Sequence, residues 1–272
     1  MRIQILGTAA AEGWPGLFCG CPTCDKARKS GSKDFRTRAS VQIDDIYKID
    51  LPPDTLYHCA QFGIDLSTLK YLFFTHSHGD HFAATEIEYL REGFSYNLAN
   101  APVRIYAPPA VHRRIAAMIR LYPDLPIELH EAVPFVPVAA DHLTFTPIVA
   151  SHTPTQLCVN YVIQSDCATA LYTPDTGTYP EETLDFVSAL SFDVLVVECT
   201  FGPTKHRPVA HMSFDAVLKL RDRLRKCGAV KPDTRIILTH FSHNMGLLHA
   251  EFEEMARPHG IEIAYDGMVV EC

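Results

Sequence analysis

The sequence predicts an α/β fold in which two mixed β-sheets are covered on their outer faces by helices. Short apolar strands alternate with amphipathic helices along the 272 residues, and several strands follow one another as hairpins between the helices. The amphipathic helices need an apolar sheet face to cover, which implies the layered arrangement. Because the sequence contains no linker or repeat, we expect residues 1–272 to form a single domain.

The individual elements follow from local apolar patterns. Runs with a period of two predict strands at residues 2–6, 40–43, 46–49, 69–75, 103–107, 143–149, 159–164, 168–172, 194–198, 235–238, 262–265 and 268–270. A helical period predicts helices at residues 55–62, 85–91, 110–121, 180–190, 213–227 and 247–257. Pro134 and Pro137 interrupt their neighbourhood, so we expect residues 124–142 to be irregular.

The charge pattern limits the classes of partner. The formal net charge is -8, and lysine and arginine are scattered, whereas binding to long nucleic acid needs a broad basic face. The first seven residues are too short and too strand-like for a signal peptide, and no run of 18 apolar residues occurs. We therefore expect a cytoplasmic protein that binds a small molecule rather than nucleic acid or a membrane. The oligomeric state stays open, with a homodimer as one alternative.

Residues 76–81 place four metal-capable side chains directly after an apolar strand, in the run HSHGDH. The strand period turns His76 and His78 to the same side, so that two imidazoles can share one ion. Gly79 permits a sharp turn, after which Asp80 and His81 can serve a second ion. These ligands suit zinc, manganese or iron, and two ions roughly 3.5–4 Å apart can hold the attacking and leaving oxygens in hydrolysis. A histidine-rich surface loop is the alternative, but this spacing at a strand end favours a metal site.

Further metal-capable residues follow three other strands. His152 follows the strand at 143–149, Asp175 the strand at 168–172, and His240 the strand at 235–238. Each lies at the C-terminal end of a strand, where a convergent site can be built. Asp175 has two carboxylate oxygens and is the natural bridge between two ions. Any one of these residues alone would be interpreted as an ordinary loop side chain, but together with the upstream motif they support one another.

Three of the nine cysteines, Cys19, Cys21 and Cys24, crowd into a loop at about residues 19–24. An odd number of cysteines without a secretion signal favours reduced thiols over a disulfide framework. Thiolates are soft zinc ligands, and three cysteines with one histidine form a closed structural set. The alternative interpretation is three reduced cysteines in a loop.

The ligand series resembles that of the metallo-β-lactamase-fold hydrolases, and it occurs here in the order His76, His78, Asp80, His81, His152, Asp175 and His240. The resemblance implies an αββα sandwich with His76, His78 and His152 on one metal. It places Asp80, His81 and His240 on the other, bridged by Asp175. Members often carry Asp-x-Gly where this chain reads Asp50-Leu51-Pro52, so the neighbouring loop is expected to differ.

The two ends of the chain are similar to the PhnP-type phosphodiesterases, which hydrolyse cyclic ribose phosphates. They read GTAAAEG at residues 7–13, THFSH at 239–243 and DGM at 266–268. In that group the three cysteines and a histidine three residues after the last active-site ligand hold a structural zinc. The resemblance therefore implies one structural zinc on Cys19, Cys21, Cys24 and His243, beside two active-site ions of zinc or manganese.

The same resemblance assigns His211 as a catalytic histidine near the leaving group. His206 is the competitor, but it lies between Lys205 and Arg207 in an expected loop, whereas His211 directly precedes the helix at 213–227. In the implied mechanism, a hydroxide shared by the two metals and oriented by Asp80 attacks the phosphorus of a small, cyclic phosphodiester. His211 then protonates the departing alkoxide.

Other functions stay open. The superfamily also contains tRNase Z-like nucleases, lactonases and thioesterases, although the scattered basic residues disfavour a nuclease. PqqB-like proteins share the N-terminal cysteine cluster and have been viewed as carriers or accessory factors. The intact ligand series favours catalysis, and metal content separates the two classes. An accessory protein could hold the structural zinc alone, whereas the enzyme should hold all three ions.

Overall fold

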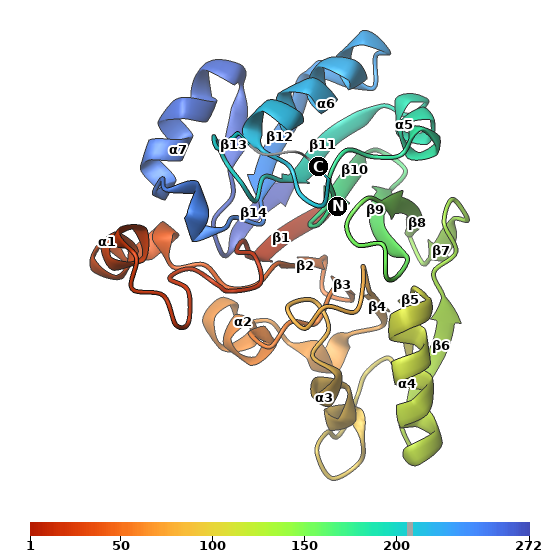
Figure 1. The fold of residues 1–272 in the computed structure, drawn as a ribbon. Helices are drawn as coiled ribbons and strands as arrows, with labels where there is room; N and C mark the ends of the chain where they lie inside the picture. The colour runs from red at the N-terminus through yellow and green to blue at the C-terminus, as the bar shows by residue number, and fades with distance from the viewer. Residues whose placement is uncertain (206–208) are drawn as a thin grey trace.

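A computed structural model describes residues 1–205 and 209–272, and it contains two seven-stranded sheets (Figure 1). The first sheet consists, in pairing order, of β14 (Met268–Glu271), β1 (Arg2–Gly7), β2 (Ser40–Ile43), β3 (Tyr47–Ile49), β4 (Tyr71–Phe73), β5 (Val103–Ala107) and β6 (Ile127–Glu131). The second consists of β13 (Ile261–Ile263), β12 (Val230–Thr239), β11 (Phe192–Glu198), β10 (Thr169–Thr173), β9 (Cys158–Gln164), β8 (Leu143–Ala150) and β7 (Val138–Ala140).

Both sheets are mixed in the same way. The strands β14, β1, β2 and β3 pair antiparallel, and β3 to β6 then pair parallel. The second sheet repeats this pattern, because β7 to β10 pair antiparallel and β10 to β13 pair parallel. As a result, several strands of each sheet end at one common edge of the molecule.

Helices cover the outer faces of the sheets, as Figure 1 shows. On the first sheet lie α2 (Thr55–Phe62), α3 (Ala84–Ile87) and α4 (Pro109–Leu121), and on the second α5 (Glu181–Ser188), α6 (Phe214–Lys226) and α7 (His249–Ala256). A further helix, α1 (Pro22–Ser30), lies in the N-terminal region. The predicted sandwich of two mixed sheets between helices is therefore confirmed. None of the described helices has the length and apolar character needed to cross a bilayer.

The alternation of side chains along the strands connects the layers. In β4, Tyr71 and Phe73 point into the core between the two sheets, whereas Leu72 and the following Phe74 pack in a second core with residues of α4. The ring of Phe73 stacks on Phe145 of β8 with 4.0 Å between centroids. A strand that is buried on both faces reads as a continuous apolar run, which is why this strand was visible in the sequence.

The structure corrects several sequence-based boundaries. The expectation of an irregular segment at 124–142 is wrong, because β6 and β7 lie within it as edge strands. In β6 most residues are polar and partly exposed, and β7 is only three residues long, so neither strand carries a long apolar run. Pro134 and Pro137 fall between them. The expected helix at 85–91 is divided into α3 and a 3₁₀ turn at Glu88–Leu90, and the strand at 69–75 is shorter. The cysteine loop at 19–24 is partly helical, since α1 begins at Pro22.

Replacing Phe73 with alanine should lower the free energy of unfolding by about 3–5 kcal/mol, because a large cavity would open between the two sheets. Urea denaturation followed by circular dichroism measures this change. Leu56→Ala on α2 is the control, since Leu56 is 77% exposed, and it should alter the free energy by less than about 0.5 kcal/mol. Equal effects of the two substitutions would contradict the packing described here.

Candidate active site

The metal-capable residues found in the sequence gather at one edge of the sandwich. His76 follows β4, His152 follows β8, Asp175 follows β10 and His240 follows β12. In the second sheet, β8, β10 and β12 run in the same direction, so their C-terminal ends share an edge, as in other α/β sites. His81 is brought into the group by a tight turn in which its N–H donates to the carbonyl of His78 over 3.1 Å.

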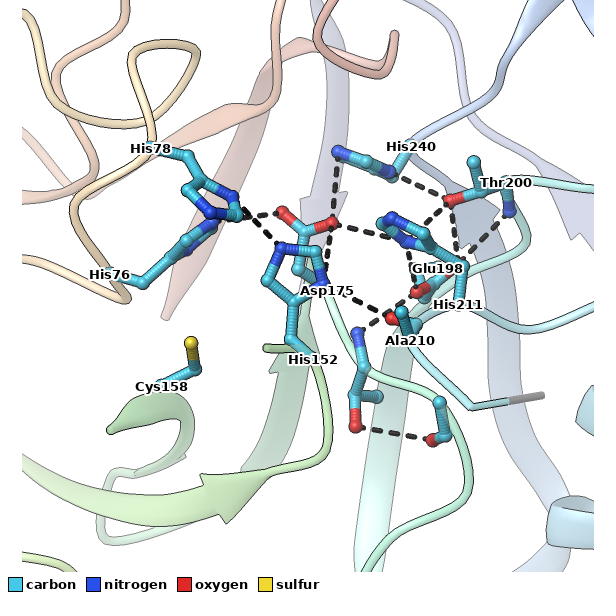
Figure 2. A network of polar contacts seen from close by, with 12 residues as sticks. His76, His78, His152, Cys158, Asp175, Glu198, Thr200, Ala210, His211 and His240 are labelled. Carbon is cyan, nitrogen blue, oxygen red and sulfur yellow. Dashed lines mark hydrogen bonds and ion pairs between the residues drawn. The ribbon is translucent and has the colours of Figure 1, made fainter. Parts of the chain in front are cut away.

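The gathered side chains form two adjoining clusters. In one, the ligand atoms of His76, His78 and His152 lie within 4.8 Å of one another, and in the other the same holds for Asp80, His81, Asp175 and His240. Figure 2 shows the carboxylate of Asp175 between the pair His76 and His78 on one side and His240 on the other. Its Oδ2 lies 3.8 Å from Nε2 of His76, and its Oδ1 lies 3.3 Å from Nε2 of His240. The structure thus brings these seven residues together in two neighbouring clusters.

The polar atoms of the two clusters fit bound cations. Nε2 of His76, His81 and His240 and Oδ2 of Asp175 are buried without a hydrogen-bond partner. His81 Nε2 and Asp175 Oδ2 approach to 2.6 Å without the geometry of a hydrogen bond. Leaving four such atoms unsatisfied would be costly in a folded protein, and divalent ions would satisfy them together. Burial would raise the pKa of the Asp175 carboxyl, but His240 and His81 outweigh burial and hold that pKa well below its usual range.

A buried carboxylate from the first sheet orients the histidines of the motif. Asp50, directly after β3, accepts from the Thr75 N–H over 2.9 Å and from the Thr75 hydroxyl over 2.8 Å, and it lies 2.7 Å from Nδ1 of His81. The same hydroxyl is 3.0 Å from Nδ1 of His76. Both imidazoles therefore direct Nε2 toward Asp175, the arrangement found behind metal-binding histidines. The sequence singled out Asp50 only as a departure from the family pattern, although its place at a strand end was a usable signal.

A second buried carboxylate, Glu198 at the end of β11, does the same for the other side of the site. It accepts from the backbone N–H groups of Thr176 and Met212 over 2.9 and 3.1 Å, and from the Thr200 hydroxyl over 2.7 Å. Thr200 Oγ1 in turn lies 2.8 Å from Nδ1 of His240. The sequence analysis missed Glu198 and Thr200. The usable signal was that Glu198 is an acidic residue at the end of β11. This strand lies between β10, which leads to Asp175, and β12, which leads to His240.

His211 is held beside the clusters by the same carboxylate. Its Nδ1 is 2.9 Å from Oε1 of Glu198 and 3.3 Å from Oδ1 of Asp175, and its ring stacks on His240 with 5.6 Å between centroids. Burial would lower the pKa of His211, but the hydrogen bond and charge of Glu198 outweigh burial and raise it to about 9. With Nδ1 occupied, Nε2 is the atom available to the cavity. His206, the competing candidate, lies outside the described residues.

These residues line a cavity of about 490 Å³. Five of the seven metal-capable side chains line it together with His211 and Thr200, namely His78, Asp80, His152, Asp175 and His240. The rest of the lining comes from residues of the N-terminal loop and of two other loops, Ala10, Ala11, Glu12, Phe201, Ser242, His243 and Asn244. A volume of this size accommodates a small-molecule substrate.

A separate cluster joins the N-terminal loop to the edge of this cavity. The sulfurs of Cys19, Cys21 and Cys24 and Nδ1 of His243 lie within 4.8 Å of one another, with Nδ1 3.4 Å from the Cys21 sulfur. The Cys24 N–H donates to the Cys21 sulfur, and this hydrogen bond lowers the pKa of the Cys21 thiol to about 6. The four ligands fit a structural zinc ion.

Comparison with known proteins agrees with this fold. Residues 53–241 match the family described as beta-lactamase superfamily domain. The chain is 25% identical to coenzyme PQQ synthesis protein B of Pseudomonas aeruginosa, in an alignment 319 positions long that covers all of both chains. The protein of that description from Acinetobacter baylyi is 24% identical, again over the full length of both.

Solved structures are similar over nearly the whole chain. A diphosphatase from the PhnP family superimposes with a TM-score of 0.79 at 24% identity, covering 100% of this chain and 97% of that one. Zinc-bound PqqB from Methylobacterium extorquens has a TM-score of 0.78 at 16% identity, with full coverage of both. The short form of human tRNase Z has a TM-score of 0.66 at 18% identity, covering 100% and 99%.

Cys21→Ser and His243→Ala should each remove about one tightly bound zinc ion per chain and lower the Tm, because structural metal binding contributes directly to folding. Elemental analysis of the purified protein and thermal denaturation measure the two effects. Cys167→Ser, at an exposed cysteine, is the matched control and should change neither quantity. Unchanged zinc content and Tm in both test variants would remove this site.

Proposed function

The chain belongs to the beta-lactamase superfamily, and from this premise we propose that it is a dinuclear metal-dependent phosphodiesterase acting on small phosphodiesters, cyclic ones included. The observation that carries the proposal is the position of Asp175 between two complete ligand clusters with His211 beside it. The small cavity and the net charge of -8 favour a small substrate over long nucleic acid. The resemblance of the chain ends to the PhnP group and the structural similarity to a PhnP-family diphosphatase support phosphate chemistry.

The proposed ligands are His76, His78 and His152 for one ion and Asp80, His81 and His240 for the other, with Asp175 shared. Two divalent ions held there would lower the pKa of water and neutralise charge on the phosphate oxygens. Asp80 lines the cavity and is in a position to accept a hydrogen bond from the attacking water, which orients that water toward phosphorus. No serine or cysteine nucleophile is needed.

His211 supplies the proton that the leaving group requires. Its Nδ1–H donates to Glu198, which fixes the ring and leaves Nε2 to carry a proton toward the substrate. After the bond between phosphorus and the leaving oxygen breaks, that proton passes from Nε2 to the alkoxide. Glu198 also holds the N–H of Met212, so the loop that carries His211 is fixed at two successive residues.

A non-catalytic role resembling that of PqqB is the second candidate. The 25% identity to coenzyme PQQ synthesis protein B over the whole chain favours this role. The cysteine cluster does not separate the two candidates, because it would serve either function. A carrier would not need His211 and Glu198 in hydrogen-bond contact beside two clusters of metal-capable side chains. The number of ions bound at the Asp175 clusters and turnover of any ester separate the two candidates.

The protein loaded with manganese or zinc should hydrolyse phosphodiesters with a kcat/KM at least about tenfold above that for lactones and thioesters. A phosphodiester offers two non-bridging oxygens that two ions can stabilise together, whereas a lactone or thioester offers one carbonyl oxygen. A panel of linear diesters, cyclic ribose phosphates, phosphomonoesters, lactones and thioesters measures this. The apoprotein is the control. A thioester or lactone turned over faster than every diester would overturn the assignment, and turnover of none would favour the carrier.

His211→Ala should slow hydrolysis of an alkyl or cyclic ribose diester by roughly 10²–10⁴-fold, the scale of a lost general acid. An activated nitrophenyl diester should be slowed much less, because nitrophenolate departs without a proton. Metal content should stay unchanged. The parallel variant His206→Ala tests the competing histidine, and a full effect from it with none from His211→Ala would show that the general acid is His206.

A further inference from the structure

Glu12 places a negative charge in the wall of the metal-lined cavity. The residue belongs to the N-terminal loop, and its side chain, 33% exposed, lines the same cavity as Asp80, Asp175 and His211. The other two carboxylates that line the cavity, Asp80 and Asp175, are both proposed metal ligands. Glu12 stands apart from them, because neither cluster of metal-capable side chains around Asp175 includes it.

The position of this carboxylate is fixed by its neighbours. The Ser242 hydroxyl donates to Oε1 over 2.5 Å, and Nε2 of His243 lies 3.7 Å from the same oxygen. His243 uses its other nitrogen toward the cysteine sulfurs. Ser242 and His243 follow the candidate ligand His240 closely in sequence. The cysteine cluster therefore anchors the loop that carries Glu12, and the edge of the active site holds its side chain in place.

The charge of Glu12 is not neutralised by a basic residue in the part of the chain that the structure covers. Within residues 1–205 and 209–272, its only recorded ion-pair partner is His243. His243 would be neutral with zinc on Nδ1, and the Ser242 hydroxyl carries no charge. A ligand phosphate in this cavity therefore meets a negative charge in the wall that no basic residue of the described chain neutralises.

From this geometry we infer that Glu12 is a specificity-determining residue that selects phosphodiesters against phosphomonoesters. The inference rests on the proposed function. A diester carries one negative charge, whereas a monoester carries nearly two at neutral pH because its second pKa is about 6, and inorganic phosphate carries more than one. The extra charge is repelled by Glu12, which weakens binding of the dianion more than binding of the monoanion. Hydrolysis of a diester creates a dianion, so the same repulsion speeds release of the product.

The test compares the metal-loaded wild type with Glu12→Gln, which keeps an acceptor for Ser242 but removes the charge. We expect inorganic phosphate to bind the variant about 5- to 20-fold more tightly by calorimetry, and the ratio of kcat/KM for nitrophenyl phosphate to that for bis(nitrophenyl) phosphate to rise by about the same factor. Both changes should shrink as ionic strength rises, since the charge is partly exposed to solvent.

Two further variants make the comparison specific. Glu12→Asp retains the charge and should retain most of the discrimination. Glu254→Gln changes the net charge equally on the exposed face of α7 and should leave phosphate binding and the substrate ratio unchanged. Unaltered phosphate affinity in Glu12→Gln would overturn the inference. So would an equal loss on both substrates accompanied by loss of zinc, because that result would assign Glu12 a purely structural role behind His243.

Measuring the binding of inorganic phosphate tests the role of Glu12 independently of the proposed phosphodiesterase activity. If the protein hydrolyses no phosphodiester, the proposed function fails, yet tighter phosphate binding by Glu12→Gln would still support the repulsion. If diesters are hydrolysed and the variant binds phosphate no better than the wild type, the proposed function stands and the role of Glu12 fails.

Discussion

The burial of Asp175 is the constraint on which the rest of the site depends. A carboxylate that is 3% exposed is stable only where positive charge or hydrogen-bond donors surround it. Here it lies between the histidines of two clusters, and three of these present a buried nitrogen without a hydrogen-bond partner. The buried anion thus lies at the point toward which the surrounding imidazoles turn, which is the place that two divalent ions would occupy.

The two sheets contribute to this arrangement in parallel ways. At the end of β3, the carboxylate of Asp50 aligns His76 and His81 through Thr75 and through a direct contact. At the end of β11, Glu198 aligns His240 through Thr200 and contacts His211 directly. Buried carboxylates behind histidines fix the ring orientation and the nitrogen that carries the proton. The large apolar core between the sheets keeps these two sets of strand ends in a constant relation.

The N-terminal loop adds a function that the strand ends do not supply. Its cysteines meet His243, which lies only three residues beyond His240. A structural ion at that point would couple the loop to the edge of the cavity, so that Glu12 faces the candidate metal site from a fixed position. Stability of the loop and selection among phosphate esters would then depend on the same few contacts.

The sequence by itself determined the α/β class, most strands and helices, and the order of the metal-capable residues, because buried strands and the HSHGDH motif leave strong local patterns. It missed β6, an edge strand with partly exposed polar residues, and β7, an edge strand of only three residues. It also missed α1, where only Cys24 and Ala27 are buried. Tertiary structure alone decided that Asp50, Glu198 and Thr200 stand behind the histidines and that Glu12 enters the cavity. These residues are far apart in the chain, and their meeting depends on how two sheets pack, which no local pattern of side chains encodes.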